Sequence, residues 1–253
     1  MNDEFYIGWQ ERVPARTGKT VRRTVVIVII AALACASMVA FSQRTIGRAV
    51  FEWGQAKEFS GILKAEPVPH LLVANANTNS FTTHYLVNPW KFGFDAKLAK
   101  QFDGQLVNLR GTRIYRDDQM MIEVERGSVT LSNIDDTAML RLIESRSESL
   151  GEQTFIGEIV DSKCFLGVMN PGQLKPHRAC AVRCISGGVP PVLLVREANG
   201  AARYLLLVSR AGKPVNQQVL EVVAEPVQIT GELVRQGEML VLRADPATYQ
   251  RVR

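Results

Sequence analysis

Cysteine and histidine are scarce in this sequence, which contains four cysteines and three histidines among 253 residues. It has no C-x-x-C pair of the kind used by disulfide oxidoreductases, no C-x-x-C-H for covalent haem, and no C-x-H and C-x-x-H segments for a Rieske cluster. A Ser/His/Asp set, a glycine-rich phosphate loop and a pair of catalytic carboxylates cannot be recognised either. These absences count against the common catalytic classes, and the sequence does not favour an enzyme.

The sequence also lacks a long run of charge of one sign. Its 30 basic and 25 acidic residues give a net charge of +5, and no stripe of basic residues alternates with aromatic ones. Because such a stripe is the usual footprint of nucleic-acid binding, we expect no nucleic-acid partner. With 46% hydrophobic residues, most of the chain is expected to fold around apolar cores.

Residues 24–42 form an uncharged apolar run, about the length needed to cross a hydrocarbon core of roughly 30 Å. Basic residues are sparse after this run, whereas five precede it: Arg12, Arg16, Lys19, Arg22 and Arg23. The positive-inside rule therefore predicts a cytoplasmic tail over 1–23, a transmembrane helix over 24–42 and extracytoplasmic domains beyond it. A cleaved signal peptide is the alternative, but the long polar lead favours an uncleaved anchor.

This topology predicts a single-pass protein of the cell inner membrane, whose partners are the membrane and other membrane or extracytoplasmic proteins. Residues 43–58 are expected to form a helical juxtamembrane stalk. An extracytoplasmic compartment is oxidising, so disulfide chemistry is open to the three cysteines beyond the membrane segment. Three is an odd number, and one thiol remains after any internal pairing.

After the stalk, short apolar segments separated by turns predict a first β domain over 59–133. A short helix is expected over 96–102. His70 and His84 fall in predicted strands, and we expect His70 at the strand surface. Residues 134–152 are predicted to form a linker helix, because an Asp135 cap is followed by apolar residues on one side.

The strand pattern then begins again, which predicts a second β domain over 153–253. Segments 155–159, 191–195, 204–208, 227–234 and 239–242 repeat the form and order of 59–63, 69–73, 84–87, 107–114 and 120–124. Five or six short strands and a short helix per copy are typical of the OB-type barrel, and an open sandwich of the same strands is the alternative. The expected fold class is therefore mainly β, with one N-terminal transmembrane helix and two tandem OB-like barrels joined by a helix.

The repeat also locates an insertion. Gly61 and Gly157 are 96 positions apart, whereas Leu71 and Leu193 are 122 apart. The second copy therefore carries about 26 extra residues between its first and second strands, at about 162–188. These residues hold most of the metal-binding and thiol side chains of the sequence: Cys164, His177, Cys180 and Cys184.

A helix over 175–185 would place His177, Cys180 and Cys184 at i, i+3 and i+7, on one narrow stripe. Three interpretations remain open. Cys164 forms a structural disulfide with Cys180 or Cys184; the four residues bind a zinc or copper ion; or Cys180 or Cys184 is a redox thiol, favoured by nearby basic residues such as Lys175 and Arg183.

The phrases D-S-K-C-F-L-G-V-M-N-P-G and H-R-A-C-A-V-R-C-I-S-G-G-V-P-P resemble a family of membrane-anchored bacterial proteins, a resemblance that implies no activity. The arrangement of one anchor and an extracytoplasmic OB-like barrel is similar to that of the periplasmic haem chaperone of cytochrome c maturation. That family's haem histidine lies in an H-x-x-x-Y motif, which none of the three histidines here matches. The resemblance therefore implies no haem site.

The expected function is that of an extracytoplasmic accessory or assembly protein for a membrane redox system, with the Cys/His site on its second β domain. A thiol–disulfide oxidoreductase and a non-catalytic interaction module with a structural disulfide are the alternatives.

Overall fold

The computed structural model describes residues 13–42, 49–75, 80–132, 147–197 and 201–252. The chain divides into two compact units, residues 1–47 and 48–253. The first contains one helix, α1 (Ala15–Ser42, 28 residues), which by length and composition could cross a membrane. It contains the predicted span and begins nine residues earlier, at Ala15.

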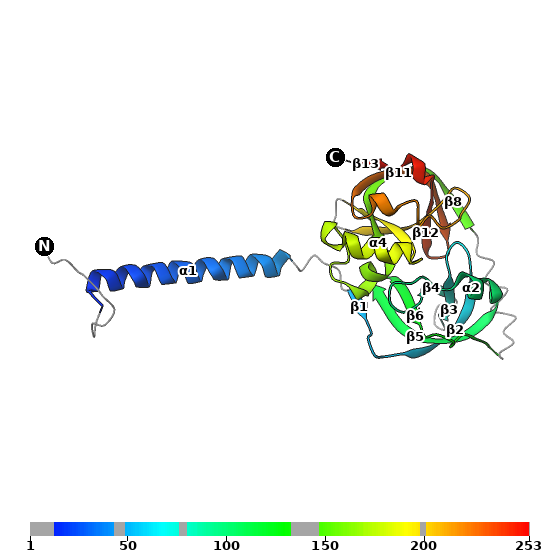
Figure 1. The fold of residues 1–253 in the computed structure, drawn as a ribbon, viewed down its shortest axis with the longest axis horizontal. Helices are drawn as coiled ribbons and strands as arrows, with labels where there is room; N and C mark the ends of the chain where they lie inside the picture. Colours follow the sequence, from blue (N-terminus) through cyan, green and yellow to red (C-terminus); the bar gives the residue numbers. More distant parts are fainter. Residues whose placement is uncertain (1–12, 43–48, 76–79, 133–146, 198–200, 253) are drawn as a thin grey trace. The chain divides into compact units, whose positions relative to one another are not determined.

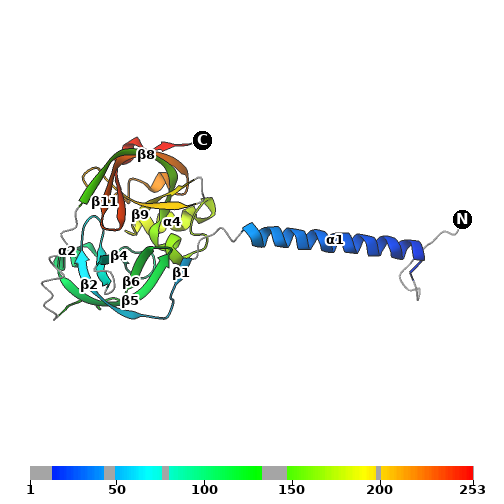
Figure 2. The same cartoon turned by 180° about the vertical axis from the view of Figure 1, so that it is seen from behind.

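The second unit holds two closed β-barrels (Figures 1 and 2). Strands of the first barrel are β2 (Lys57–Lys64), β3 (His70–Asn75), β4 (Ser80–Val87), β5 (Leu106–Arg116) and β6 (Gln119–Val124). Their order is β5-β2-β3-β4-β6, and pairing of β5 with β6 closes the barrel. β4 and β6 run parallel, and helix α2 (Ala96–Gln101) is capped by Asp95, which accepts hydrogen bonds from the amides of Lys97 and Leu98.

The second barrel repeats this topology. Its strands are β8 (Ser147–Asp161), β9 (Pro191–Arg196), β10 (Ala202–Val208), β11 (Pro226–Gln236) and β12 (Met239–Arg243). Their order is β12-β10-β9-β8-β11, pairing of β12 with β11 closes the barrel, and β10 and β12 run parallel. A 3-10 turn (Leu220–Val222) stands in the place of α2. The predicted two OB-like barrels are confirmed.

The duplication extends to strand register. Gly61 lies opposite Val107 in the first barrel, and Gly157 lies opposite Val227 in the second. Short strands at the edges also correspond: β7 (Thr130–Leu131) pairs with β5 as β13 (Gln250–Arg251) pairs with β11. A side chain on Gly61 or Gly157 would collide with a carbonyl of the neighbouring strand, at 2.5 Å and 2.6 Å from a Cβ. The glycine that marks the repeat is therefore needed for close strand approach in both barrels.

Two predicted helices are wrong in the part of each that the structure describes, for the same reason. The expected helical stalk over 43–58 contains strand β1 (Ala49–Phe51), which pairs with residues 114–116 of β5, and the start of β2. The expected linker helix over 134–152 is strand from residue 147, and 147–149 pair with 234–236 of β11. These two segments are counterparts, because β1 pairs with the end of β5 as residues 147–149 of β8 pair with the end of β11. The remaining parts of both predictions, residues 43–48 and 134–146, lie outside the described residues.

The barrels are joined by a shared apolar core. It contains Tyr85, Val87, Ile114 and Met121 from the first barrel, and from the second it contains Val160, Val192, Leu194, Tyr204, Leu206, Val208, Met239 and Val241. Several of these positions are counterparts in the repeat, so the two copies pack through similar faces. Each barrel has a further core of its own. Residues 48–253 are therefore one folding unit, in which two repeats bury each other's surface.

The predicted insertion is also present. Residues 65–69 connect β2 to β3, whereas residues 162–190 connect β8 to β9. This long connection contains a π-helical turn (Cys164–Val168), a 3-10 turn (Lys175–His177) and helix α4 (Arg178–Ser186). Phe165 and Leu166 of the turn enter the shared core, which fixes the insertion between the barrels.

Candidate functional site

The candidate site is built by the insertion where it leaves β8. The expected helix over 175–185 is present, although its first three residues form the 3-10 turn. Pro176 suits this first turn because it needs no amide partner there. Gly187 caps α4, and Gly188, at φ +96°, turns the chain towards β9. These local features place two cysteines of α4 beside the π-helical turn.

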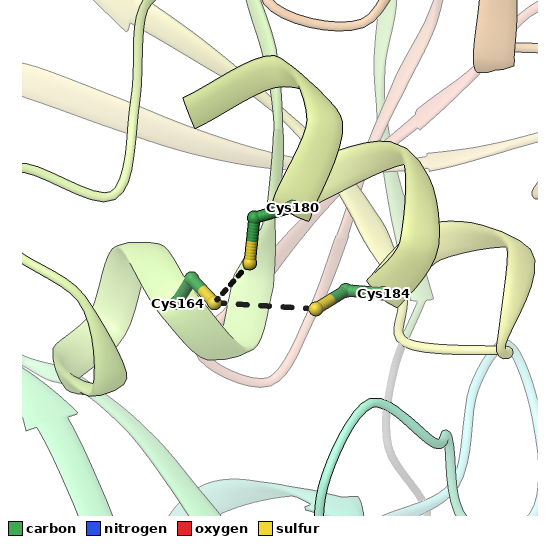
Figure 3. Close-up of side chains that lie close together, drawn as sticks. All are labelled: Cys164, Cys180 and Cys184. Atoms are coloured by element: carbon green, nitrogen blue, oxygen red, sulfur yellow. Dashed lines mark hydrogen bonds between the residues drawn. The ribbon is translucent and has the colours of Figure 1, made fainter. Parts of the chain in front are cut away.

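Three thiols meet at this point. The sulfur of Cys164 lies 3.9 Å from that of Cys180 and 4.0 Å from that of Cys184. Figure 3 shows the side chains of Cys180 and Cys184 pointing from α4 towards Cys164. All three sulfurs lie within 4.8 Å of one another, so this cluster could hold a metal ion. Cys164 and Cys184 are buried, whereas Cys180 is partly exposed.

His177 belongs to a second group rather than to the three-thiol cluster. Its Nε2 lies 2.9 Å from Oδ2 of Asp161, and these two side chains and the Cys164 sulfur lie within 4.8 Å of one another. Oδ1 of Asp161 accepts a hydrogen bond of 2.7 Å from the Cys164 amide. The four predicted ligands therefore divide into two groups that share Cys164.

Asp161 was not identified from the sequence. The available signal is a carboxylate at the end of an apolar strand and three residues before a cysteine, in G-E-I-V-D-S-K-C. Its exposed fraction is 0%, and a buried carboxylate requires partners. The Cys164 amide and His177 supply them.

Lys91 is the second residue that the sequence did not reveal, and it comes from the first barrel. Its Nζ lies 2.7 Å from the Cys180 sulfur and 3.8 Å from the Cys184 sulfur. The lysine is 89 positions from Cys180 along the chain. Only the packing of one barrel on the other brings it to the thiols, so the site belongs to both copies.

The segment that carries Lys91, residues 88–93, is held against the insertion. Lys163 has a side-chain exposure of 2%, and its Nζ donates to the carbonyls of Asn88 (2.9 Å) and Trp90 (2.6 Å). The amide of Gly93 donates to the carbonyl of Gly187. Trp90 has a φ of +66°, which is unusual for a bulky residue. These contacts fix the backbone on both sides of Lys91.

The thiols are electrostatically unequal. Hydrogen bonding to Cys184 and burial raise the pKa of Cys164. The hydrogen bond from Cys164, supported by the Lys91 charge, lowers the pKa of Cys184. The hydrogen bond to Cys180 raises the pKa of Lys91. The lysine ammonium faces the sulfurs of α4, at 2.7 Å from Cys180 and 3.8 Å from Cys184.

The other two histidines lie in strands away from this cluster. His70 is buried, contrary to the expected surface position, and its Nδ1 lies 2.8 Å from the Val68 carbonyl oxygen. His84 is also buried, and its Nε2 lies 3.1 Å from the Thr82 hydroxyl. Burial lowers the pKa of each to about 4. Both are neutral parts of the first barrel.

No protein-family model and no curated protein matches this chain.

Proposed function

We propose that this protein is a membrane-anchored, extracytoplasmic metal-binding protein that serves as an accessory or assembly factor for a membrane redox system. The ion is held by the three thiols, and copper(I) is the ion that this ligand set suits best. The observation that carries the proposal is the mutual approach of three cysteine sulfurs from two different elements, the π-helical turn and α4.

The sulfur separations fit metal ligation better than a disulfide. With metal–sulfur bonds of about 2.3 Å, ligand sulfurs lie about 3.8 Å apart in tetrahedral geometry and about 4.0 Å apart in trigonal geometry. The two separations from Cys164 are 3.9 and 4.0 Å, and the sulfurs of Cys180 and Cys184 lie within 4.8 Å of each other. A disulfide requires about 2.05 Å and joins two of the three sulfurs, leaving the third unused.

The ligand set favours copper(I) over zinc. Structural zinc sites are closed by four protein ligands, and soft thiolates also select copper(I). His177 is occupied by Asp161, and within the described ranges the three thiols are not grouped with any fourth ligand atom. Three thiolates around one monovalent ion satisfy this arrangement without a further ligand.

An accessory role agrees with the surroundings of the thiols. α1 is apolar enough to span a membrane, and the basic residues before the apolar run favour a cytoplasmic N-terminus, which would put both barrels outside. Cys180 is the partly exposed thiol of the three, so an incoming ligand from another protein that displaces the Lys91 side chain can reach the ion there. Ligand exchange at Cys180 would pass the ion to a membrane or extracytoplasmic partner.

A thiol–disulfide oxidoreductase is the second candidate, and one observation favours it. Cys180 is partly exposed, next to the Lys91 ammonium, and 3.9 Å from Cys164. A partly exposed thiol beside a cation with a second thiol behind it is the arrangement of a dithiol redox pair. In that case Cys180 would react first and Cys164 would complete the disulfide.

Metal content and thiol content together separate these functions. The full-length chain is purified in detergent with Cys35 replaced by serine, because that thiol lies in α1 and would confuse the count. We expect one copper(I) per chain, lost in both Cys164→Ser and Cys180→Ser. A chain that binds no stoichiometric metal and has two thiols missing from a free-thiol titration would refute the metal function. Reduction of that disulfide by mild thiols would then support the oxidoreductase, and resistance would leave a structural cross-link.

A further inference from the structure

We propose that Lys91 of the first barrel determines which metal ion the three-cysteine site accepts, by occupying the side on which a fourth ligand would bind. This inference rests on the proposed metal-binding function and adds its ion specificity. The lysine excludes ions that need four ligands, and the site retains a three-coordinate monovalent ion.

The position of the ammonium group supports this role. Lys91 Nζ contacts two of the three sulfurs, those of Cys180 at 2.7 Å and Cys184 at 3.8 Å. Cys164 and Cys184 are both buried in an apolar cluster with Val189, whereas Cys180 is partly exposed. The solvent-facing approach to the sulfurs is at Cys180, and this is where the lysine lies. A water or side chain that completed a tetrahedral site from this direction would have to displace it.

The position is fixed by the backbone rather than by the lysine side chain alone. Lys163 binds the carbonyls of Asn88 and Trp90 immediately before Lys91. On the other side, a Cβ on Gly187 would lie 2.0 Å from the Lys91 carbonyl oxygen, so the α4 terminus is in direct contact with the lysine backbone. A side chain held in this way is less free to leave than a lysine on an open surface.

The repeat provides an internal comparison. The counterpart of segment 88–92 in the second barrel is 209–213, and both are closed by an amide-to-carbonyl hydrogen bond, Asn88 to Phe92 and Ser209 to Lys213. Lys213 of that segment faces the short connection of the first barrel, where its Nζ lies 2.9 Å from Glu66. Each copy therefore places a lysine against the connection of the other. At the insertion, Lys91 contacts the thiols of Cys180 and Cys184, whereas Lys213 contacts the carboxylate of Glu66.

Charge and coordination act in the same direction. A lysine ammonium offers three donors and no lone pair, so it cannot serve as the missing ligand while it is protonated. Zinc sites keep a fourth ligand, whereas copper(I) is satisfied by soft thiolates. The fixed positive charge also repels a divalent ion twice as strongly as a monovalent ion at the same distance. Both effects disfavour zinc relative to copper(I).

The test compares zinc and copper(I) affinities in the full-length Cys35→Ser chain, by competition with chromophoric chelators in detergent under anaerobic, reducing conditions. Lys91→Gln removes the charge and keeps a side chain of similar bulk, and Lys91→Arg keeps a cation in the same place. Lys213→Gln is the matched control, because it changes a lysine of the counterpart segment that contacts Glu66 and not the thiols.

We expect Lys91→Gln to raise the affinity for zinc relative to copper(I) by about tenfold or more, given the short distance and partial exposure of the charge. Lys91→Arg and Lys213→Gln should keep the wild-type ratio. If Lys91→Gln binds copper(I) but keeps that ratio within about twofold, the specificity role is wrong and the metal site stands. If the wild-type chain binds neither ion, the proposed function fails and the inference fails with it.

Discussion

The strongest test of how the two barrels are held together is the replacement of Lys163 by alanine. The ammonium of Lys163 lies 2.5 Å from Oε2 of Glu123, and the side-chain exposures are 2% and 15%. Removing one partner of a buried ion pair costs about 3–5 kcal/mol, because the other charge stays in a poorly solvated place. Glu123 keeps some contact with water, so we expect the lower end, about 3 kcal/mol.

The loss should be visible in thermal unfolding. For a unit the size of residues 48–253, about 1 kcal/mol corresponds to about 2–4 °C in Tm, so Lys163→Ala should lower Tm by about 6–12 °C. The assay is circular dichroism on the full chain in detergent at fixed pH and salt. Lys213→Ala is the control: it breaks an ion pair whose members are 66% and 52% exposed, and such pairs contribute about 1 kcal/mol or less.

A second variant distinguishes a lost charge pair from general damage. Lys163→Met combined with Glu123→Gln leaves no buried charge, and part of the lost stability should return. If Lys163→Ala lowers Tm no more than Lys213→Ala does, the contacts of Lys163 with Glu123 and with the backbone of residues 88–93 do not stabilise the fold as we expect.

Three further predictions concern neighbouring features. Gly187→Ala should cost about 1–3 kcal/mol, because its Cβ would overlap the Lys91 carbonyl at 2.0 Å; the measurement is the urea midpoint, and an unchanged midpoint would contradict the close packing. Asp161→Asn should lower the free energy of unfolding by about 3 kcal/mol in the same assay, since the buried carboxylate binds His177. The double variant with His177→Gln should lose little more than Asp161→Asn alone. Additive losses would mean that the two side chains act separately. Burial lowers the pKa of His70 from 6.5 to about 4, so the unfolded chain binds a proton that the folded chain excludes. The neutral His70 costs no stability above pH 6.5, and up to about 3 kcal/mol of stability is lost as the pH falls towards 4. His70→Asn should therefore make the free energy of unfolding less dependent on pH between 6.5 and 4. If the slope with pH stays the same, other groups cause this dependence.

The repeat and the insertion could be predicted because they depend on local patterns. Alternating apolar residues mark strands buried on one face, and a glycine at each first strand gives the register. The difference between the Gly61–Gly157 and Leu71–Leu193 spacings then locates the insertion without any structural information. The same patterns failed at β1 and the start of β8, whose residues are partly or fully exposed and show no alternation. Those segments are strands because β5 and β11 offer them edges, which is a tertiary effect.

The site could be located but not assembled from the sequence. The helical stripe correctly placed Cys180 and Cys184 on one side of α4, but His177 lies in a 3-10 turn. His177 is instead paired with the buried carboxylate of Asp161, at 2.9 Å, and the pattern of a single helix cannot reveal a partner at the end of β8. Lys91 could not be found, because no pattern within one copy shows which loop of the other copy will face it.

The sharing of the site between the copies has a consequence for the order of events during synthesis. The first barrel is made before the insertion, and the insertion before strands β9 to β12 that complete the second barrel. Lys91 reaches the thiols through the packing of one barrel on the other, because it lies 89 positions before Cys180 in the chain. A chain that has not yet reached this packing lacks the contacts of Lys91 with the sulfurs of Cys180 and Cys184. The mature site is thus a marker of completed folding, and its properties would distinguish finished molecules from nascent ones.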